Sequence, residues 1–94
     1  MACRLQDDQL SGVIDFDNLT EIRRVGEARI GEVSESLSID LSGLEKANSA
    51  TVALLIAWFR AAEAQEKSIV FVEIRPELRN IIAFSGLDQV LPLA

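Results

Sequence analysis

The chain has 94 residues, with nine lysines and arginines against fifteen aspartates and glutamates, so its formal net charge is -6. This length can bury one hydrophobic core, and we expect a single domain over residues 1–94. The negative charge repels a phosphate backbone, which argues against nucleic-acid binding. Histidine is absent and Cys3 is the only cysteine, so we expect no intrachain disulfide, no metal site and no cofactor.

Three sequence features indicate a cytoplasmic protein. The first ten residues contain no apolar segment of the kind found in signal peptides. The longest apolar run covers residues 50–59, whereas a membrane-spanning helix needs roughly 20 residues. The single cysteine favours a reducing compartment. We therefore expect a cytoplasmic protein without direct membrane insertion.

Residues 3–15 predict two short strands around a turn at Asp7 and Asp8. Asp17 is then expected to cap a helix. The apolar positions of that helix form one narrow stripe, made of Leu19, Ile22, Gly26, Ile30 and Val33. Gly26 costs about 1 kcal/mol of helix propensity relative to alanine. We therefore expect the helix and sheet backbones to approach closely at this glycine.

Two further strands are predicted later in the chain. Residues 36–44 alternate apolar and polar side chains, as a half-buried strand does. Residues 68–74 form a continuous rather than alternating run, which favours a central strand that is covered on both faces or lies deep in the sheet. A helix is expected between these two strands, beginning near Ser49.

The last part of the chain predicts a third helix and a short strand. Pro76 is suited to the first turn of the helix, and Gly86 to its left-handed end, with Leu87 packing back in a Schellman arrangement. Residues 90–93 predict a strand at an edge of the sheet, because Pro92 has no N–H to donate. Strands separated by helices favour parallel pairing, and the first two strands form an antiparallel hairpin. The predicted fold is therefore α/β, a small mixed β-sheet with about three helices.

The second helix has two apolar faces. The face expected to contact the sheet consists of Val52, Leu55, Ile56, Phe59 and Ala62. A second ridge consists of Leu54, Ala57, Trp58 and Ala61. Either a neighbouring helix covers this ridge, or the ridge is exposed and binds another protein, since tryptophan is enriched among interface anchors. Ser49 and Thr51 stand at the head of the helix, where they could act as N-caps or belong to a binding surface.

Three stretches of the sequence resemble STAS domains. The stretch "IDLSGLEKANSATVALL" is similar to their central strand, loop and helix, in which an Asp-Ser/Thr-Ser/Gly-Gly-Leu pattern opens the helix. "LSGVIDFDN" resembles their second strand, and "PELRNIIAFSGLDQVLPL" resembles their last helix and strand. The three stretches have the order and spacing of that family over nearly the whole chain. The resemblance implies a STAS-like fold, also called anti-sigma factor antagonist-like.

The resemblance implies one of two non-catalytic roles in a bacterial cell. B subunits of the lipid-asymmetry-maintenance (Mla) phospholipid transporter are short STAS proteins that clamp its cytoplasmic ABC-type ATPase subunit. Anti-sigma factor antagonists bind an anti-sigma factor kinase and are switched off by phosphorylation of the serine corresponding to Ser49. In both cases the partner binds at the N-terminus of the second helix. The expected partner-binding residues are Asn48, Ser49, Ala50, Thr51, Leu54 and Trp58.

Two departures from the STAS pattern favour the transporter subunit. Asn48 replaces the family's aspartate and Thr51 replaces its glycine, which alters the charge and backbone freedom around a phosphorylatable serine. The short chain and the apolar helix "ALLIAWFRAAEAQ" also resemble transporter subunits. The first hypothesis is therefore a protein that binds and regulates an ABC-type ATPase subunit, and the alternative is an anti-sigma factor antagonist.

An enzyme is the hypothesis from a different functional class. Asp15, Asp17 and Asp40 could supply carboxylates, but no side chain is suited to act as a base at neutral pH without a large pKa shift. Asp17 is better explained as a helix cap, and Asp40 as a solvated strand residue. We therefore expect no catalytic residues.

Overall fold

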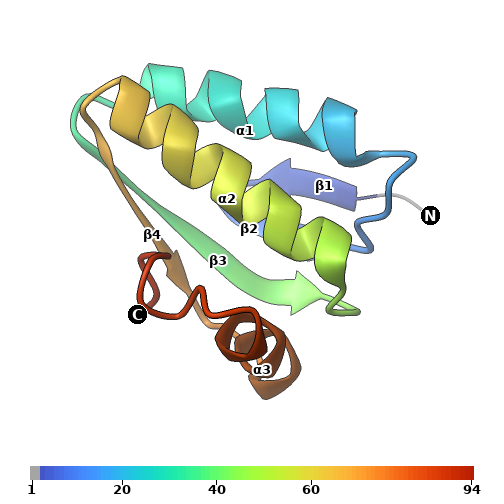
Figure 1. Cartoon of the computed structure of the whole chain (residues 1–94). Helices are drawn as coiled ribbons and strands as arrows, with labels where there is room; N and C mark the ends of the chain where they lie inside the picture. The colour runs from blue at the N-terminus through green and yellow to red at the C-terminus, as the bar shows by residue number, and fades with distance from the viewer. Residues whose placement is uncertain (1–2) are drawn as a thin grey trace.

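The computed structural model describes residues 3–94 and contains a four-stranded sheet and three helices. In chain order the elements are β1 (Cys3–Gln6), β2 (Gln9–Gly12), α1 (Leu19–Glu32), β3 (Ser36–Leu44), α2 (Ser49–Ala64), β4 (Ser68–Val72) and α3 (Pro76–Phe84). The strands lie in the order β1-β2-β3-β4 (Figure 1). The predicted α/β fold, a small mixed sheet with about three helices, is confirmed. None of the helices in this part of the chain is long and apolar enough to cross a membrane.

The β1–β2 hairpin forms as predicted. Its strands pair antiparallel, from Cys3 opposite Gly12 to Gln6 opposite Gln9. The two residues between them, Asp7 and Asp8, both have positive φ angles, 53° and 60°. A two-residue turn of this kind needs left-handed conformations at both positions, and aspartate tolerates them better than most residues.

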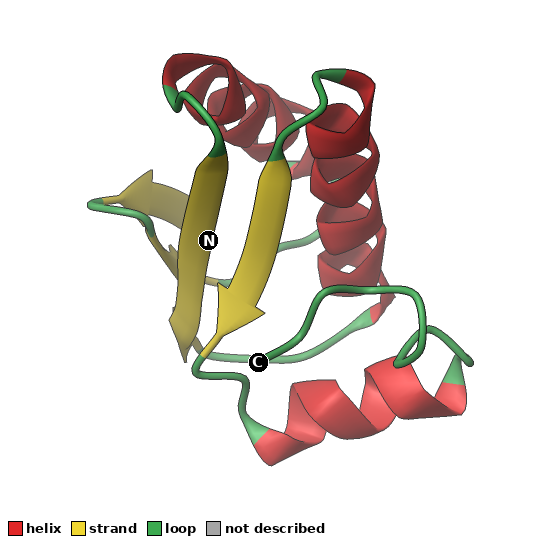
Figure 2. Ribbon diagram, turned by 90° about the vertical axis from the view of Figure 1, so that its left-hand side faces the viewer, coloured by secondary structure: helices red, strands yellow, loops and turns green. Residues whose placement is uncertain are grey.

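The other strand pairings are parallel and place three loops at one edge of the sheet. β3 pairs in parallel with β2 on one side and with β4 on the other. The carboxyl ends of these three strands therefore point the same way, as Figure 2 shows for the strands nearest the viewer. The loops that follow them, residues 13–18, 45–48 and 73–75, begin at the same edge.

The last predicted strand is reduced to one bridge, in which Leu93 pairs in parallel with Phe71. Pro92 has no N–H, but it takes part in the pairing through its carbonyl, which accepts a hydrogen bond from Phe71 N at 2.9 Å. The expectation that β4 is covered on both faces is wrong. Ile69 and Phe71 are buried, whereas the alternate side chains of β4 are half-buried or exposed.

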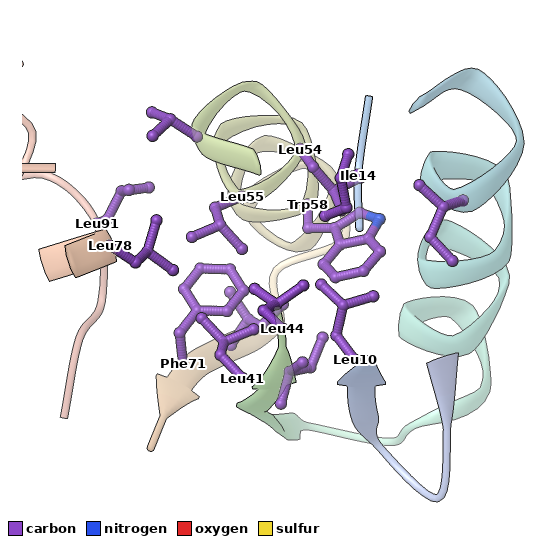
Figure 3. Packing of buried hydrophobic residues seen from close by; sticks show 14 of the residues in the cluster. Leu10, Ile14, Leu41, Leu44, Leu54, Leu55, Trp58, Phe71, Leu78 and Leu91 are labelled. Carbon is purple, nitrogen blue, oxygen red and sulfur yellow. The ribbon is translucent and has the colours of Figure 1, made fainter. Parts of the chain in front are cut away.

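The core lies between the sheet and the pair α1 and α2, which cover the same face of the sheet (Figures 1 and 2). Figure 3 shows its main side chains, Leu10, Ile14, Leu41, Leu44, Leu54, Leu55, Trp58, Phe71, Leu78 and Leu91. Of the predicted sheet-facing side chains of α2, Val52, Leu55 and Ala62 are buried, and Ile56 and Phe59 are half-buried. Leu54 and Trp58 are buried as well, each with 0% of its surface exposed.

Trp58 is covered by α1, which decides between the two alternatives for the second ridge of α2. Its indole Nε1 donates to the carbonyl oxygen of Arg23 at 3.0 Å. A Cβ atom at Gly26 would overlap the indole ring. Gly26 is therefore where two helices approach, and the expected approach of helix and sheet backbones at this glycine is wrong.

The helix ends agree only partly with the sequence predictions. α1 begins one residue later than expected, and its N-cap is Asn18 rather than Asp17. α3 begins at Pro76, and Gly86 after its end has a φ of 74°. The N–H of Leu87 donates to the carbonyl of Ile82 at 3.0 Å, which confirms the Schellman arrangement.

Candidate functional site

The candidate site lies at the sheet edge where β2 and β3 end and α2 begins. The loop after β3 is held to the end of β2, because Glu45 N donates to Gly12 O at 2.9 Å. The two chain segments also continue side by side beyond the strands. The N-terminus of α2 therefore opens beside the loop between β2 and α1.

Asn48 joins the two loops and caps α2. Its side-chain Oδ1 accepts from Thr51 N at 2.9 Å, which satisfies one of the free N–H groups of the first helical turn. Its Nδ2 donates to Ile14 O, in the loop after β2, at 2.8 Å. One amide thus provides an acceptor for the helix and a donor for the neighbouring loop. The N-cap role considered for Ser49 and Thr51 belongs to Asn48.

Most of the predicted partner-binding residues are interior. Ala50 and Thr51 are buried, and Thr51 Oγ1 donates to Asn48 Oδ1 at 3.2 Å. Leu54 and Trp58 belong to the core described above, so of the two alternatives for the second ridge of α2 the exposed apolar strip is wrong. Without rearrangement of the helices, these four side chains cannot contact a partner.

Ser49 is the exception among the predicted residues. It is exposed at the first position of α2, and within residues 3–94 no hydrogen bond holds its hydroxyl. Asn48, directly before it, is half-buried. We call the N-terminus of α2, at Asn48 and Ser49, the mouth of α2. A partner that binds there would contact the Ser49 hydroxyl, and Asn48 holds this end of the helix in place.

The two loops beside the start of α2 contain exposed residues that were not predicted from the sequence. Glu45 and Lys46 are exposed in the loop before α2. Phe16, in the loop between β2 and α1, leaves 73% of its surface exposed. In the sequence, Phe16 could have been recognised as an exposed residue only because it stands between two aspartates and outside any apolar periodicity.

The hollow beside the loop before α2 is small. It lies between this loop and the start of α3, and its lining includes Ala47, Arg75 and Leu78. It holds about 20 Å³, which is space for about one water molecule. No group of three or more potential metal-ligating side chains occurs within residues 3–94.

Two titratable side chains of the sheet have shifted pKa values. Asp40 lies on the half-exposed face of β3, and hydrogen bonds from Ser42, one from its N–H at 2.7 Å, hold the pKa of its carboxyl below the usual value. Such a carboxylate is a weak base at neutral pH. Burial raises the pKa of the Cys3 thiol to about 11, so the thiol is protonated at neutral pH.

Comparisons with known proteins give one family and one fold. A family model described as "Mlab, STAS domain" matches residues 4–92. A chain of the Acinetobacter MlaFEDB complex, in an ATP-bound conformation, is 30% identical, with full coverage of both chains and a TM-score of 0.81. A comparison with curated proteins finds no match.

Anti-sigma factor antagonists are also similar in structure. The antagonist from Mycobacterium paratuberculosis is 26% identical, with 98% of this chain and 81% of that chain covered and a TM-score of 0.74. The antagonist SpoIIAA in its unphosphorylated form is 21% identical, with coverage of 99% and 88% and a TM-score of 0.71. The second likeness concerns the fold alone.

Proposed function

The chain belongs to the STAS family, and we propose that it is a non-catalytic subunit that binds and regulates the ATPase subunit of an Mla-type phospholipid ABC transporter. The observation that carries the proposal is the likeness to a chain of the Acinetobacter MlaFEDB complex, which extends over both chains from end to end. The protein would act at the cytoplasmic side of the membrane, where the ATPase hydrolyses its nucleotide. Its contact surface would be the N-terminus of α2, with Ser49 at the centre.

The local structure around Ser49 supports this surface. The side chain is exposed, while its neighbours Asn48 and Thr51 are fixed by hydrogen bonds to each other and to the next loop. A binding group on such a rigid base loses little conformational entropy when a partner docks. The ATPase would contact the Ser49 hydroxyl directly.

A second candidate function is that of an anti-sigma factor antagonist, which the likeness to the Mycobacterium paratuberculosis protein favours. The partner would then be an anti-sigma factor kinase, and phosphorylation of Ser49 would control binding. The exposed hydroxyl is accessible to such a kinase. Asn48 weighs against this role, because its amide occupies the position of the family's aspartate and is engaged with Ile14 O.

Substitutions at Ser49 test the proposal through binding of the purified ATPase subunit. Ser49→Asp should weaken binding at least about tenfold, equivalent to about 1.4 kcal/mol, because it places a charge under the docked partner. The melting temperature of the free protein should change little, since a helix N-terminus accommodates a negative charge. Ser49→Ala should also weaken binding if the hydroxyl makes the contact, whereas an antagonist controlled by phosphorylation would tolerate it.

The matched control is Ser34→Asp, which adds the same charge to an exposed serine in the loop before β3, at the opposite edge of the sheet. This variant should bind like the wild type. Binding of an anti-sigma factor kinase, with none of the ATPase subunit, would contradict the proposal and favour the second function. Wild-type affinity for the ATPase in both Ser49 variants would mean that the contact surface lies elsewhere.

A further inference from the structure

Phe16 is a large apolar side chain that the fold leaves mostly exposed. It lies in the loop between β2 and α1 and leaves 73% of its surface exposed. Burying such a side chain against a partner is favourable roughly in proportion to the apolar area removed from water. Large aromatic side chains of this kind are common anchors of protein interfaces.

The loop that carries Phe16 is fixed on both sides of this residue. Asp15 Oδ1 accepts from the N–H groups of Asp17 and Asn18, each at 2.9 Å. Asn18 Oδ1 accepts from Asp15 N at 3.0 Å, and Asn18 Nδ2 donates to Val13 O at 3.0 Å. These bonds order the loop before any partner arrives, so presenting Phe16 costs little additional entropy on binding.

The same loop is joined to the mouth of α2. Ile14, two residues before Phe16, is buried beside Leu54 and Trp58 (Figure 3), and its carbonyl accepts from Asn48 Nδ2 at 2.8 Å. Asn48 directly precedes Ser49. The loop that carries Phe16 is therefore bonded to the residue before Ser49, the first residue of α2, and a partner that covers one can cover the other.

The charges around Phe16 indicate the chemistry of that partner. Asp15 and Asp17 flank it in the sequence, and Glu21 lies in the first turn of α1. In the neighbouring loop Glu45 and Lys46 are exposed and cancel each other. A second copy of this chain would bring the same acidic groups together, and an anionic membrane would repel them. A surface with basic side chains is complementary.

We propose that Phe16 is the apolar anchor of the ATPase-binding surface, and that the ATPase subunit receives it in an apolar socket bordered by lysine or arginine side chains. The inference rests on the proposed function and specifies its partner surface. Phe16 would contribute affinity through burial of its ring, and Asp17, beside it, would speed association by attracting the basic rim.

The test measures binding of the purified ATPase subunit to single variants of this protein. Phe16→Ala should weaken binding at least about tenfold, mainly through faster dissociation. It should leave the melting temperature of the free protein unchanged, because the side chain is exposed. Asp17→Lys should slow association and reduce its dependence on ionic strength. Phe84, at the end of α3, is 96% exposed and provides the matched control, so Phe84→Ala should bind like the wild type.

The outcomes separate this inference from the proposed function. If Ser49→Asp weakens binding as expected but Phe16→Ala does not, the inference is wrong and the proposed function stands. An equal loss in Phe84→Ala would also overturn it, because any exposed phenylalanine would then contribute. If the wild-type protein does not bind the ATPase at all, the proposed function fails before Phe16 is tested. Self-association of the free protein that Phe16→Ala removes would identify a second copy as the occupant and overturn the inference.

Discussion

At the scale of single residues, Asn48 is the side chain on which the mouth of α2 depends. It accepts a hydrogen bond from Thr51 N and donates one to Ile14 O. A carboxylate can accept the first bond but cannot donate the second. This explains in physical terms why the amide is suited to this chain where the family pattern has an aspartate.

We therefore expect Asn48→Asp to destabilise the protein. The helix cap would remain, because aspartate caps as well as asparagine does. The bond to Ile14 O would be replaced by a carboxylate facing a carbonyl oxygen, at a cost of about 1–3 kcal/mol. Urea unfolding at pH 7 measures the loss. Ser49→Ala, at the exposed neighbouring position, should change stability by less than about 0.5 kcal/mol. Equal stability of Asn48→Asp and the wild type would show that the bond to Ile14 contributes nothing.

The sequence located the mouth of α2 but could not separate its exposed residues from its buried ones. Asn48 and Thr51 are both polar, and the sequence alone does not reveal that their side chains bond to each other. The assignment of Asp17 as the cap of α1 failed for a similar reason. Asp15, Asp17 and Asn18 are all good capping residues within four positions, and only the folded loop shows which groups they satisfy.

At the scale of elements, the contact between α1 and α2 is made by a tryptophan against a glycine. Periodicity correctly placed Trp58 on a different side of α2 from Leu55. It gives the angle of a residue around its own helix but does not identify what lies on that side. The neighbour of Trp58 is Gly26 of α1, whose lack of a side chain leaves the space that the indole ring occupies.

Two glycines of α1 test this contact. Gly26→Ala should destabilise the protein by about 1–3 kcal/mol through overpacking against Trp58, although alanine is the better helix former. Gly31→Ala is the matched control, since its Cβ would meet only Gln65 Oε1, at 3.9 Å. That variant should be neutral or more stable by up to about 1 kcal/mol. Thermal unfolding distinguishes them, and a stabilised Gly26→Ala would show that Trp58 can move aside easily.

At the scale of the whole molecule, an ion pair connects the hairpin to the helical layer. Arg29 of α1 donates to both carboxylate oxygens of Asp8 in the hairpin turn, at 2.7 and 3.1 Å. The hydrogen bond from Arg29, followed by its charge, lowers the pKa of Asp8. Both side chains are about one third exposed, so solvent screens the pair.

The lowered pKa predicts how stability depends on pH. A carboxylate with a lower pKa in the folded state stabilises the fold above its unfolded pKa of about 3.9, and loses this contribution as the pH falls through the folded value. Asp8→Asn should therefore be less stable than the wild type at pH 7, and the difference should shrink below about pH 4. Asparagine also tolerates the positive φ of this position. Urea unfolding between pH 2 and 7 measures both proteins, and a difference independent of pH would contradict the prediction.

The parallel arrangement of β2, β3 and β4 bears on how such proteins diverge. Pairing and packing constrain the strands and the inward faces of the helices. The exposed positions of the loops that begin at one edge, such as Phe16, Asp17 and Lys46, take part in neither. Mutations can therefore accumulate there without loss of the fold. A new partner requires a few changes in short loops, so one fold of this kind can serve different partners while its core stays unchanged.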